Sequence, residues 1–114
     1  MIDLGYFTLE TADLAKAKAF YSALFGWTFD GASSHGAYAH VADSNPPFGF
    51  TKVERVGSAA NLYFRVDDIQ AVCARVVELG GKAAVPSETR TGLSAVVCDD
   101  QGLSFSLWQP AQGY

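Results

Sequence analysis

The sequence predicts an α+β fold in which one unit, a strand followed by a helix and three strands, occurs twice. Segment Asp13–Trp27 carries apolar residues at spacings of three and four, the pattern of a helix with one buried face. Segment Asp68–Gly81 repeats this pattern 55 residues later. A second set of matches, at an offset of 56, pairs Gly36, Ala39, Val41 and Asp43 with Gly92, Ala95, Val97 and Asp99. Two such units are expected to close over a shared interior, because neither can bury a sheet face alone.

Both predicted helices have recognisable ends. Asp13 and Asp68 can cap the N-termini, because a carboxylate accepts hydrogen bonds from the amides that the first turn leaves free. Gly26 follows the first helix and Gly80–Gly81 the second, and glycine enters the left-handed region at little cost. The two helices are therefore expected to stop at these glycines.

The strands are indicated by β-branched and aromatic residues between clusters of turn residues. In the first unit they are expected at 2–10, 27–29, 36–42 and 48–54, around a helix over 13–25. In the second unit they are expected at 61–66, 82–85, 93–98 and 103–109, around a helix over 68–79. Loops or turns are expected at 31–34, 43–47, 86–91 and 99–102, with a linker at 55–60. We therefore expect one domain over 1–114, with modules over about 1–56 and 57–114.

Composition and charge exclude several classes of function. Hydrophobic residues make up 49% of the chain and charged residues 18%, as in a globular protein. The net charge is −4, and no basic stripe that could neutralise phosphates is present, so no nucleic-acid partner is expected. No apolar run approaches the ~20 residues of a membrane span. The start MIDLGYFTLE lacks a basic residue, so we do not expect it to be a secretory signal. We expect a cytoplasmic protein without a membrane partner.

The two cysteines, Cys73 and Cys98, have no metal-ligand spacing and no activating neighbour in the sequence. Cys73 lies on the apolar face of the second helix, and Cys98 ends the apolar run LSAVVC. Both are expected to be reduced core thiols. A disulfide and a nucleophilic role remain as alternatives.

Several stretches resemble one family. The segment DLAKAKAFYSALFGW resembles the first helix of glyoxalase and bleomycin-resistance proteins, which with the extradiol dioxygenases form the vicinal oxygen chelate superfamily. The segments VDDIQAVCARVVELGG and DDQGLSFSLWQ resemble the second module of that family with its closing turn and strand. The resemblance covers roughly residues 4–109. It implies two tandem βαβββ modules whose mixed sheets curl into a cup, with the helices outside and the ligand inside.

In the metal-dependent members of this family, four side chains on the inner strands hold a divalent ion. Carried over by register, these positions fall at Tyr6, Asn61, Ser106 and, within one residue, Phe50. Hard divalent ions prefer carboxylates, imidazoles or carbonyls as ligands. Of these groups, the four residues supply at most the amide oxygen of Asn61. The histidines, His35 and His40, have no carboxylate at a ligand spacing. We therefore expect no metal site and no cofactor.

Without a metal, the resemblance implies a cup lined by aromatic and polar side chains. Because strand residues two positions apart share a face, the neighbours of the metal-ligand positions are also expected to face inward. Tyr38 or His40 is expected to lie nearby. The candidate ligand-binding residues are Tyr6, Thr8, His40, Phe48, Phe50, Asn61, Tyr63, Arg65, Ser106 and Trp108. Such a surface combines apolar area with a few fixed donors and acceptors, as small-molecule pockets do.

Three functions remain open on the sequence. The first is metal-independent binding of a small amphipathic or aromatic molecule, as in bleomycin-resistance proteins. The second is a glyoxalase-like lyase or isomerase, or a dioxygenase-like enzyme, acting on a small oxygenated substrate. No catalytic residue is assigned for it beyond His40 as a candidate general base, because imidazole titrates near neutrality. The third is a partner-binding module whose cup is filled by its own aromatic residues. Open sheet edges and the family resemblance also predict a homodimer.

Overall fold

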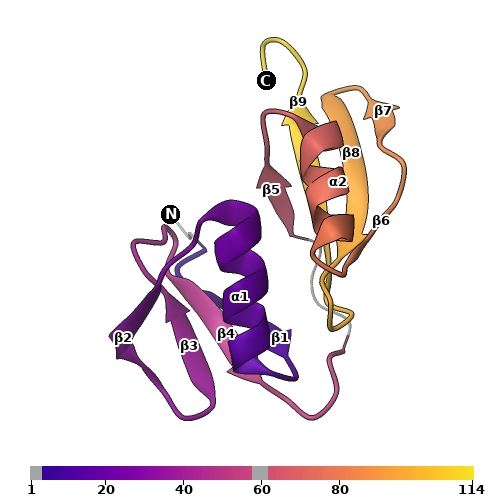
Figure 1. The fold of residues 1–114 in the computed structure, drawn as a ribbon. Helices are drawn as coiled ribbons and strands as arrows, with labels where there is room; N and C mark the ends of the chain where they lie inside the picture. The colour runs from indigo at the N-terminus through magenta and orange to yellow at the C-terminus, as the bar shows by residue number, and fades with distance from the viewer. Residues whose placement is uncertain (1–3, 58–61) are drawn as a thin grey trace. The chain divides into compact units, whose positions relative to one another are not determined.

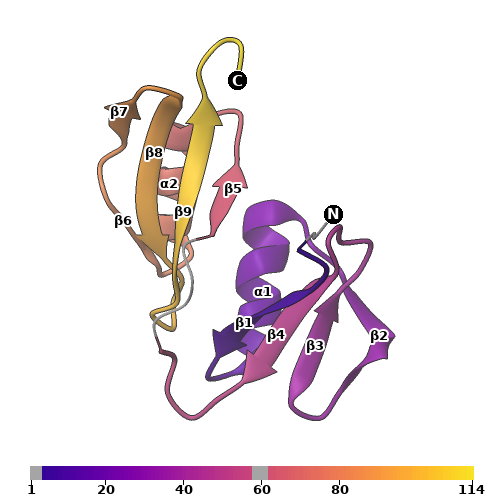
Figure 2. The same ribbon diagram turned by 180° about the vertical axis from the view of Figure 1, so that it is seen from behind.

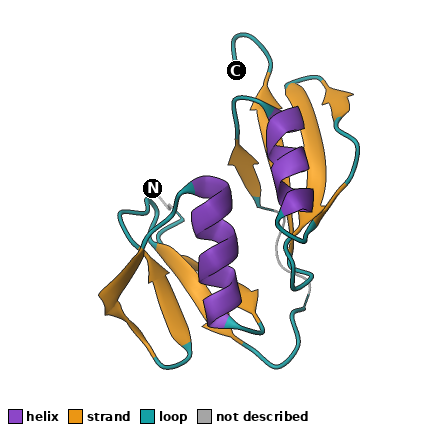
Figure 3. Cartoon of the chain, in the orientation of Figure 1, coloured by secondary structure: helices purple, strands orange, loops and turns teal. Residues whose placement is uncertain are grey.

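The predicted order of strand, helix and further strands is present in both halves of the chain. The computed structural model describes residues 4–57 and 62–114. The chain divides into two units, Met1–Gly57 and Ser58–Tyr114, and each is described by itself. Each unit has one helix and one mixed sheet, so the α+β prediction is confirmed (Figure 3).

The first unit is a four-stranded sheet with one helix against it (Figure 1). Its elements are β1 (Phe7–Thr11), α1 (Leu14–Phe25), β2 (Phe29–His35), β3 (Tyr38–Val41) and β4 (Phe48–Lys52). The strand order is β1-β4-β3-β2, with β1 parallel to β4 and the other neighbours antiparallel. The helix covers one face of the sheet, so the other face is left open.

The second unit repeats this topology with one added short strand. Its elements are β5 (Tyr63–Arg65), α2 (Ile69–Glu78), β6 (Lys82–Ala83), β7 (Ser87–Thr89), β8 (Gly92–Cys98) and β9 (Ser104–Pro110). The order is β5-β9-β8-β6, β5 is parallel to β9, and β7 pairs with β8. The view from behind shows the sheet face opposite α2 (Figure 2).

Both helices begin at the predicted aspartates. The Lys16 backbone N–H donates to Asp13 Oδ1 at 3.2 Å, and the Ala71 backbone N–H donates to Asp68 Oδ1 at 3.1 Å. Both cap residues have extended backbone angles, as N-caps require. The caps are thus equivalent in the two units.

The helix ends differ in detail between the units. Gly26 ends α1 with φ at 74°, as predicted. After α2, the positive φ of 97° belongs to Gly80. A Cβ at Gly81 would clash with the Cys98 carbonyl oxygen, so this glycine permits a close approach of two backbones. The two adjacent glycines therefore have different roles.

Aromatic side chains form the core of the first unit. Tyr21 and Phe50 are both 0% exposed, and their ring centroids are 4.9 Å apart. Trp27 stacks on Tyr21 at 5.3 Å with 13° between the ring planes. Phe48 stacks on Phe7 of the neighbouring strand at 4.7 Å. The helix side of this sheet is thus closed by aromatic rings.

The prediction that Phe48 and Phe50 face a ligand is wrong in register. In the parallel pair of β1 and β4, Phe50 is opposite Leu9, which is 1% exposed. Both phenylalanines therefore lie on the helix side, since paired residues share a face. Strand alternation then places Gly49 and Thr51 on the open face.

The second core is more aliphatic. Ile69 and Val76 of α2 are 0% exposed, as is Leu107 of β9. Phe64 meets Phe105 edge-on at 5.4 Å. Two of the four repeat matches found in the sequence have the same burial in both units: Ala39 and Val41 are buried in β3, as are Ala95 and Val97 in β8. The other two differ, because Gly36 and Asp43 are exposed whereas Gly92 and Asp99 are buried.

Two segments that were expected to be loops contain strands. Strand β2 runs through residues 31–34, although its pairing with β3 shifts between Asp30 and His35. Asp30 Oδ1 there accepts from the Ala32 backbone N–H at 2.9 Å, a contact typical of turns. Strand β7 lies within the predicted loop 86–91 and is fully exposed. Both strands lack the apolar alternation that identifies a strand in a sequence.

The cysteines are both free, with Cys73 buried and Cys98 half-buried. Burial raises the pKa of the Cys73 thiol. Across residues 4–57 and 62–114, no helix combines the length and the apolar character that crossing a membrane requires.

Candidate functional site

The open face of the second unit gathers four of the predicted ligand-binding residues. Tyr63 is opposite Ser106, and Arg65 is opposite Trp108, in the parallel pair of β5 and β9. On the other side of β9, Trp108 is opposite Ser94 of β8. Paired residues share a face, so these side chains lie together on the side away from α2. The sequence predicted this face from strand alternation.

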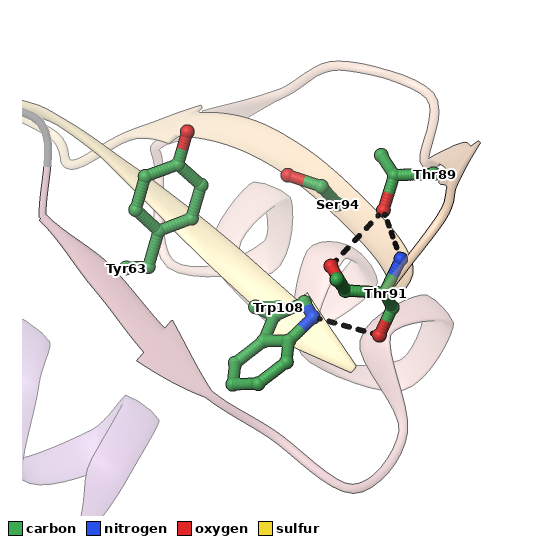
Figure 4. A pocket seen from close by; sticks show the side chains of 5 residues that line it. All are labelled: Tyr63, Thr89, Thr91, Ser94 and Trp108. Atoms are coloured by element: carbon green, nitrogen blue, oxygen red, sulfur yellow. Dashed lines mark hydrogen bonds between the residues drawn. The ribbon is translucent and has the colours of Figure 1, made fainter. Parts of the chain in front are cut away.

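A pocket of about 370 Å³ lies on this face. Its lining residues are Tyr63, Thr89, Thr91, Ser94 and Trp108. Figure 4 shows Tyr63 at one end of the pocket and Thr89 with Thr91 at the other, with Ser94 and Trp108 between them. The pocket thus has aromatic rings and hydroxyl groups within reach of one small molecule.

Three of these lining residues, Thr89, Thr91 and Ser94, were not predicted. Thr89 belongs to β7, a polar edge strand that the sequence does not distinguish from a loop. Ser94 was placed on a strand, and its register opposite Trp108 would have identified it. Its hydroxyl makes no hydrogen bond within the described part of the chain, so it is available to a ligand.

The Trp108 ring is held on two sides. Its indole Nε1–H donates to the Thr91 carbonyl oxygen at 3.2 Å. The Arg65 guanidinium carbon lies 5.5 Å from the ring centroid, within cation–π range. Arg65 also donates to the Tyr114 carbonyl oxygen at 3.4 Å. The ring is therefore oriented before any ligand arrives, and a positive charge lies beside it.

The open face of the first unit carries a second group of polar aromatic residues. Tyr38 Oη lies 2.7 Å from His40 Nδ1. Tyr6, 51% exposed, has its ring centroid 6.5 Å from that of Tyr38. Burial, followed by a hydrogen bond with the Tyr6 side chain, raises the pKa of Tyr38 to about 12. Thr8 is exposed on this face, opposite Gly49 of β4.

The fourth position of the family's metal set falls at Gly49 by this register. In the second unit Tyr63 is opposite Ser106, and in the first Thr8 is opposite Gly49, so Gly49 corresponds to Ser106. Asn61 lies outside the described residues. Tyr6, Gly49 and Ser106 offer no carboxylate or imidazole, so they do not fit a divalent ion. In the described ranges, no three His, Cys, Asp or Glu side chains cluster as metal ligands would.

The role of His40 as a general base stays a prediction. Its Nδ1 is engaged by Tyr38 Oη at 2.7 Å. The ligand-binding roles of Tyr6, Thr8, Tyr63, Arg65, Ser106 and Trp108 are likewise predictions. Five of these residues lie on strands, on the face away from the helix, although Ser106 is only 8% exposed there. Tyr6 directly precedes β1.

Comparisons with known proteins agree with this architecture. The family model of the glyoxalase-like domain matches residues 6–108. The putative glyoxylase CFP32 of Mycobacterium tuberculosis is 32% identical over 118 residues, which cover 89% of this chain and 43% of that protein. The anthracycline biosynthesis protein DnrV of Streptomyces peucetius is 28% identical, covering 92% of this chain and 46% of its own length. The chain thus spans less than half the length of these two relatives.

Solved structures have the same fold. An antibiotic binding protein of Streptomyces sp. CB03234, TnmS3, is 30% identical with a TM-score of 0.74, covering 97% of this chain and 98% of its own. A glyoxalase/bleomycin resistance protein/dioxygenase family enzyme of Burkholderia phytofirmans has a TM-score of 0.80 at 21% identity, covering 96% and 100%. The tandem strand–helix units, the family match over residues 6–108 and these likenesses together show that the chain belongs to the glyoxalase-like domain family.

Proposed function

We propose that this protein binds a small amphipathic or aromatic molecule, without a metal ion, in the pocket of the second unit. One observation carries this proposal: Tyr63, 60% exposed, and the oriented Trp108 ring line one pocket with three hydroxyl-bearing residues. Tyr63 is exposed, so it contributes little to the packing of the hydrophobic core. The Trp108 indole beside it is held in place by two contacts.

The dimensions and chemistry of the pocket support a small ligand. Its volume of about 370 Å³ lies at the lower end of the range of small-molecule sites, roughly 300–1,000 Å³. Aromatic stacking contributes about 0.5–1.5 kcal/mol beyond the buried area. The Ser94 hydroxyl can both donate and accept, which would fix the orientation of a polar edge. A planar molecule with a polar edge would contact both the aromatic rings and the hydroxyl groups of the pocket.

The names of relatives support the same class of ligand. TnmS3, at 30% identity, is described as an antibiotic binding protein, and DnrV is named for anthracycline biosynthesis. Anthracyclines are planar aromatic molecules with hydroxyl and carbonyl groups. An anthracycline is therefore the first ligand to test.

Binding is tested by thermal unfolding of the whole chain with and without an anthracycline. A ligand at 100 times its dissociation constant should add ~2.7 kcal/mol to the free energy of unfolding and so raise the melting temperature. We expect Trp108→Ala and Tyr63→Ala each to weaken binding by up to about tenfold, as the loss of one stacking contact implies.

The matched control is Val77→Ala, because Val77 is 56% exposed on α2 and does not line the pocket. Binding equally strong in Tyr63→Ala, Trp108→Ala and Val77→Ala would rule out this pocket. A melting temperature unmoved by any planar aromatic ligand would reject the function itself.

We also propose that the protein is a homodimer. Each sheet ends in edge strands with unpaired backbone groups, such as β2 in the first unit and β5 in the second, and these can pair with another chain. Light scattering should give twice the monomer mass of 12.2 kDa at micromolar concentration. The monomer mass would contradict the proposal.

A further inference from the structure

A further pocket lies at one end of the sheet of the second unit. Its volume is about 260 Å³, and Arg65, Asp67, Gln109, Ala111 and Tyr114 are among the residues that line it. These residues lie at or just after the C-terminal ends of the parallel strands β5 and β9. Complete small-molecule sites measure roughly 300–1,000 Å³, so this smaller space fits one substituent of a ligand. We refer to it as the end pocket.

The end pocket is separate from the open sheet face. Gln109 follows Trp108 along β9, so its side chain is on the helix side of the sheet. There the Gln109 Oε1 accepts from the Ile69 backbone N–H, at the start of α2, at 2.8 Å. The end pocket therefore reaches from Arg65, on the open face, around the end of the sheet to Gln109 on the other side.

Two contacts join the end pocket to the pocket that Trp108 lines on the open face. The Arg65 guanidinium carbon lies 5.5 Å from the Trp108 ring centroid. The Thr91 carbonyl oxygen accepts from the Trp108 Nε1–H at 3.2 Å and from the Ala111 backbone N–H at 2.7 Å. Trp108 and Thr91 line the open-face pocket, whereas Arg65 and Ala111 line the end pocket. The two pockets thus adjoin, and a ligand stacked on Trp108 can extend a substituent past Arg65.

The end pocket offers both an acceptor and donors of hydrogen bonds. In the described part of the chain, the exposed Asp67 carboxylate has no hydrogen-bond or ion-pair partner, and it can only accept. The Ile69 N–H can only donate, so the Gln109 atom that faces it is the amide oxygen. The Gln109 NH₂ group keeps two hydrogens to donate. Arg65 gives one N–H to the Tyr114 carbonyl oxygen at 3.4 Å and has further N–H groups.

These groups favour a neutral substituent with several hydroxyl groups. A phosphate would be attracted by Arg65 but repelled by Asp67, and an ammonium group would meet the opposite pair of forces. A hydroxyl group both donates and accepts, so neighbouring hydroxyls can bond to Asp67 and to Gln109 at the same time. Resting on the function proposed above, we propose that the end pocket binds a sugar substituent. The ligand class is then a neutral glycoside of a planar aromatic molecule.

The sugar site is tested with hydroxymethylanthraquinone and its β-glucoside, a pair of uncharged ligands that differ only in the sugar. Titrations of the whole chain, followed by tryptophan fluorescence, give the two dissociation constants. We expect the glucoside to bind about tenfold more tightly than the aglycone, as net hydrogen bonds to the sugar imply. Equal dissociation constants would overturn the sugar site.

Two variants remove the proposed sugar contacts and leave the open-face pocket intact. Asp67→Ala removes the acceptor, and Gln109→Glu removes the NH₂ donor while keeping an oxygen for the Ile69 N–H. Each should lower the advantage of the glucoside to about twofold, with the affinity of the aglycone unchanged. An advantage that stays near tenfold in both variants would overturn the assignment of the end pocket.

Glu78→Ala is the matched control for Asp67→Ala. It removes the same charge from an exposed residue at the end of α2 that lines neither pocket. The full advantage of the glucoside should remain in this variant. A loss equal to that in Asp67→Ala would show a general effect of charge and overturn the contact with Asp67.

Tyr63→Ala separates this proposal from the proposed function. It should weaken the aglycone and the glucoside by the same factor, because Tyr63 lines only the open-face pocket. An aglycone that binds as tightly as the glucoside would reject the sugar site and leave the proposed function supported. A glucoside advantage that depends on Asp67, in a protein indifferent to Tyr63→Ala and Trp108→Ala, would support the end pocket and reject the stacking site. Failure of both ligands to bind would reject both proposals.

Discussion

Phe50 lies with its ring centroid 4.9 Å from that of Tyr21, and this contact establishes which face of β4 is turned toward α1. Both residues are completely buried. Because strand residues alternate between faces, the burial of Phe50 places Gly49 on the opposite side, where Tyr38 covers it. The position of the Tyr6–Tyr38–His40 group therefore follows from an aromatic contact on the other side of the sheet.

Replacing Phe50 with alanine should destabilise the protein strongly. The ring is 0% exposed, and its removal would leave a cavity beside Tyr21, at a cost of about 3–5 kcal/mol. Urea unfolding followed by tryptophan fluorescence would measure the loss, since Trp27 stacks on Tyr21. The matched change Tyr63→Ala removes an aromatic ring that is 60% exposed and should cost far less. Similar losses in both variants would contradict the assignment of faces.

The cap of α2 gives a second stability prediction. Asp68→Ala removes the acceptor of the Ala71 N–H and should lower the free energy of unfolding by about 1 kcal/mol. Asp67→Ala is the control, because it removes the same charge one residue earlier without removing the cap. Chemical unfolding of the two variants side by side would separate the cap from the charge. Equal values would show that the cap hydrogen bond contributes nothing.

Arg65 should bias the second-unit pocket toward neutral or acidic aromatic ligands. Its guanidinium carbon lies 5.5 Å from the Trp108 ring centroid. It would therefore attract a carboxylate on a ligand stacked there and repel an ammonium group. Arg65 is exposed, so the effect should be modest, about 0.2–1 kcal/mol or up to fivefold in affinity.

Calorimetry with an aromatic acid and the matching amine would test this charge preference in the native protein and in Arg65→Gln. The preference should shrink in the variant and at high salt, where exposed charges are screened. A preference for the amine in the native protein would refute it.

Tyr38 gives a prediction for alkaline pH. Burial and the hydrogen bond with Tyr6 raise its pKa from 10.0 to about 12 in the folded chain. The folded state then holds this proton more tightly than the unfolded state. The resulting stability is complete below pH 10 and is lost as the pH rises from 10 toward 12.

Tyr38→Phe should therefore flatten the decline of the unfolding free energy over this alkaline interval, as followed by urea titrations at a series of pH values. Tyr114→Phe serves as the control for a tyrosine on the surface. If native protein and Tyr38→Phe decline in parallel, the pKa of Tyr38 is not raised.

Most of the candidate residues in the second unit were placed correctly by alternation alone. Tyr63 and Arg65 lie opposite Ser106 and Trp108, on the face predicted for them. The same rule failed for Phe48 and Phe50, because an unbroken run of apolar residues in FGFTKVE does not reveal which members face the helix. Only the pairing of Phe50 with the buried Leu9 decides between the two faces.

The sequence by itself determined the duplicated order of elements and the ends of both helices. These depend on local chemistry: a capping aspartate, apolar residues at helical spacing, and a glycine at the end. The tertiary structure alone decided the register of β4, the presence of the polar edge strand β7, and the meeting of Tyr38 with His40 above Gly49. Each of these depends on which strand lies beside which, and backbone pairing between distant segments leaves no periodic signal in either segment.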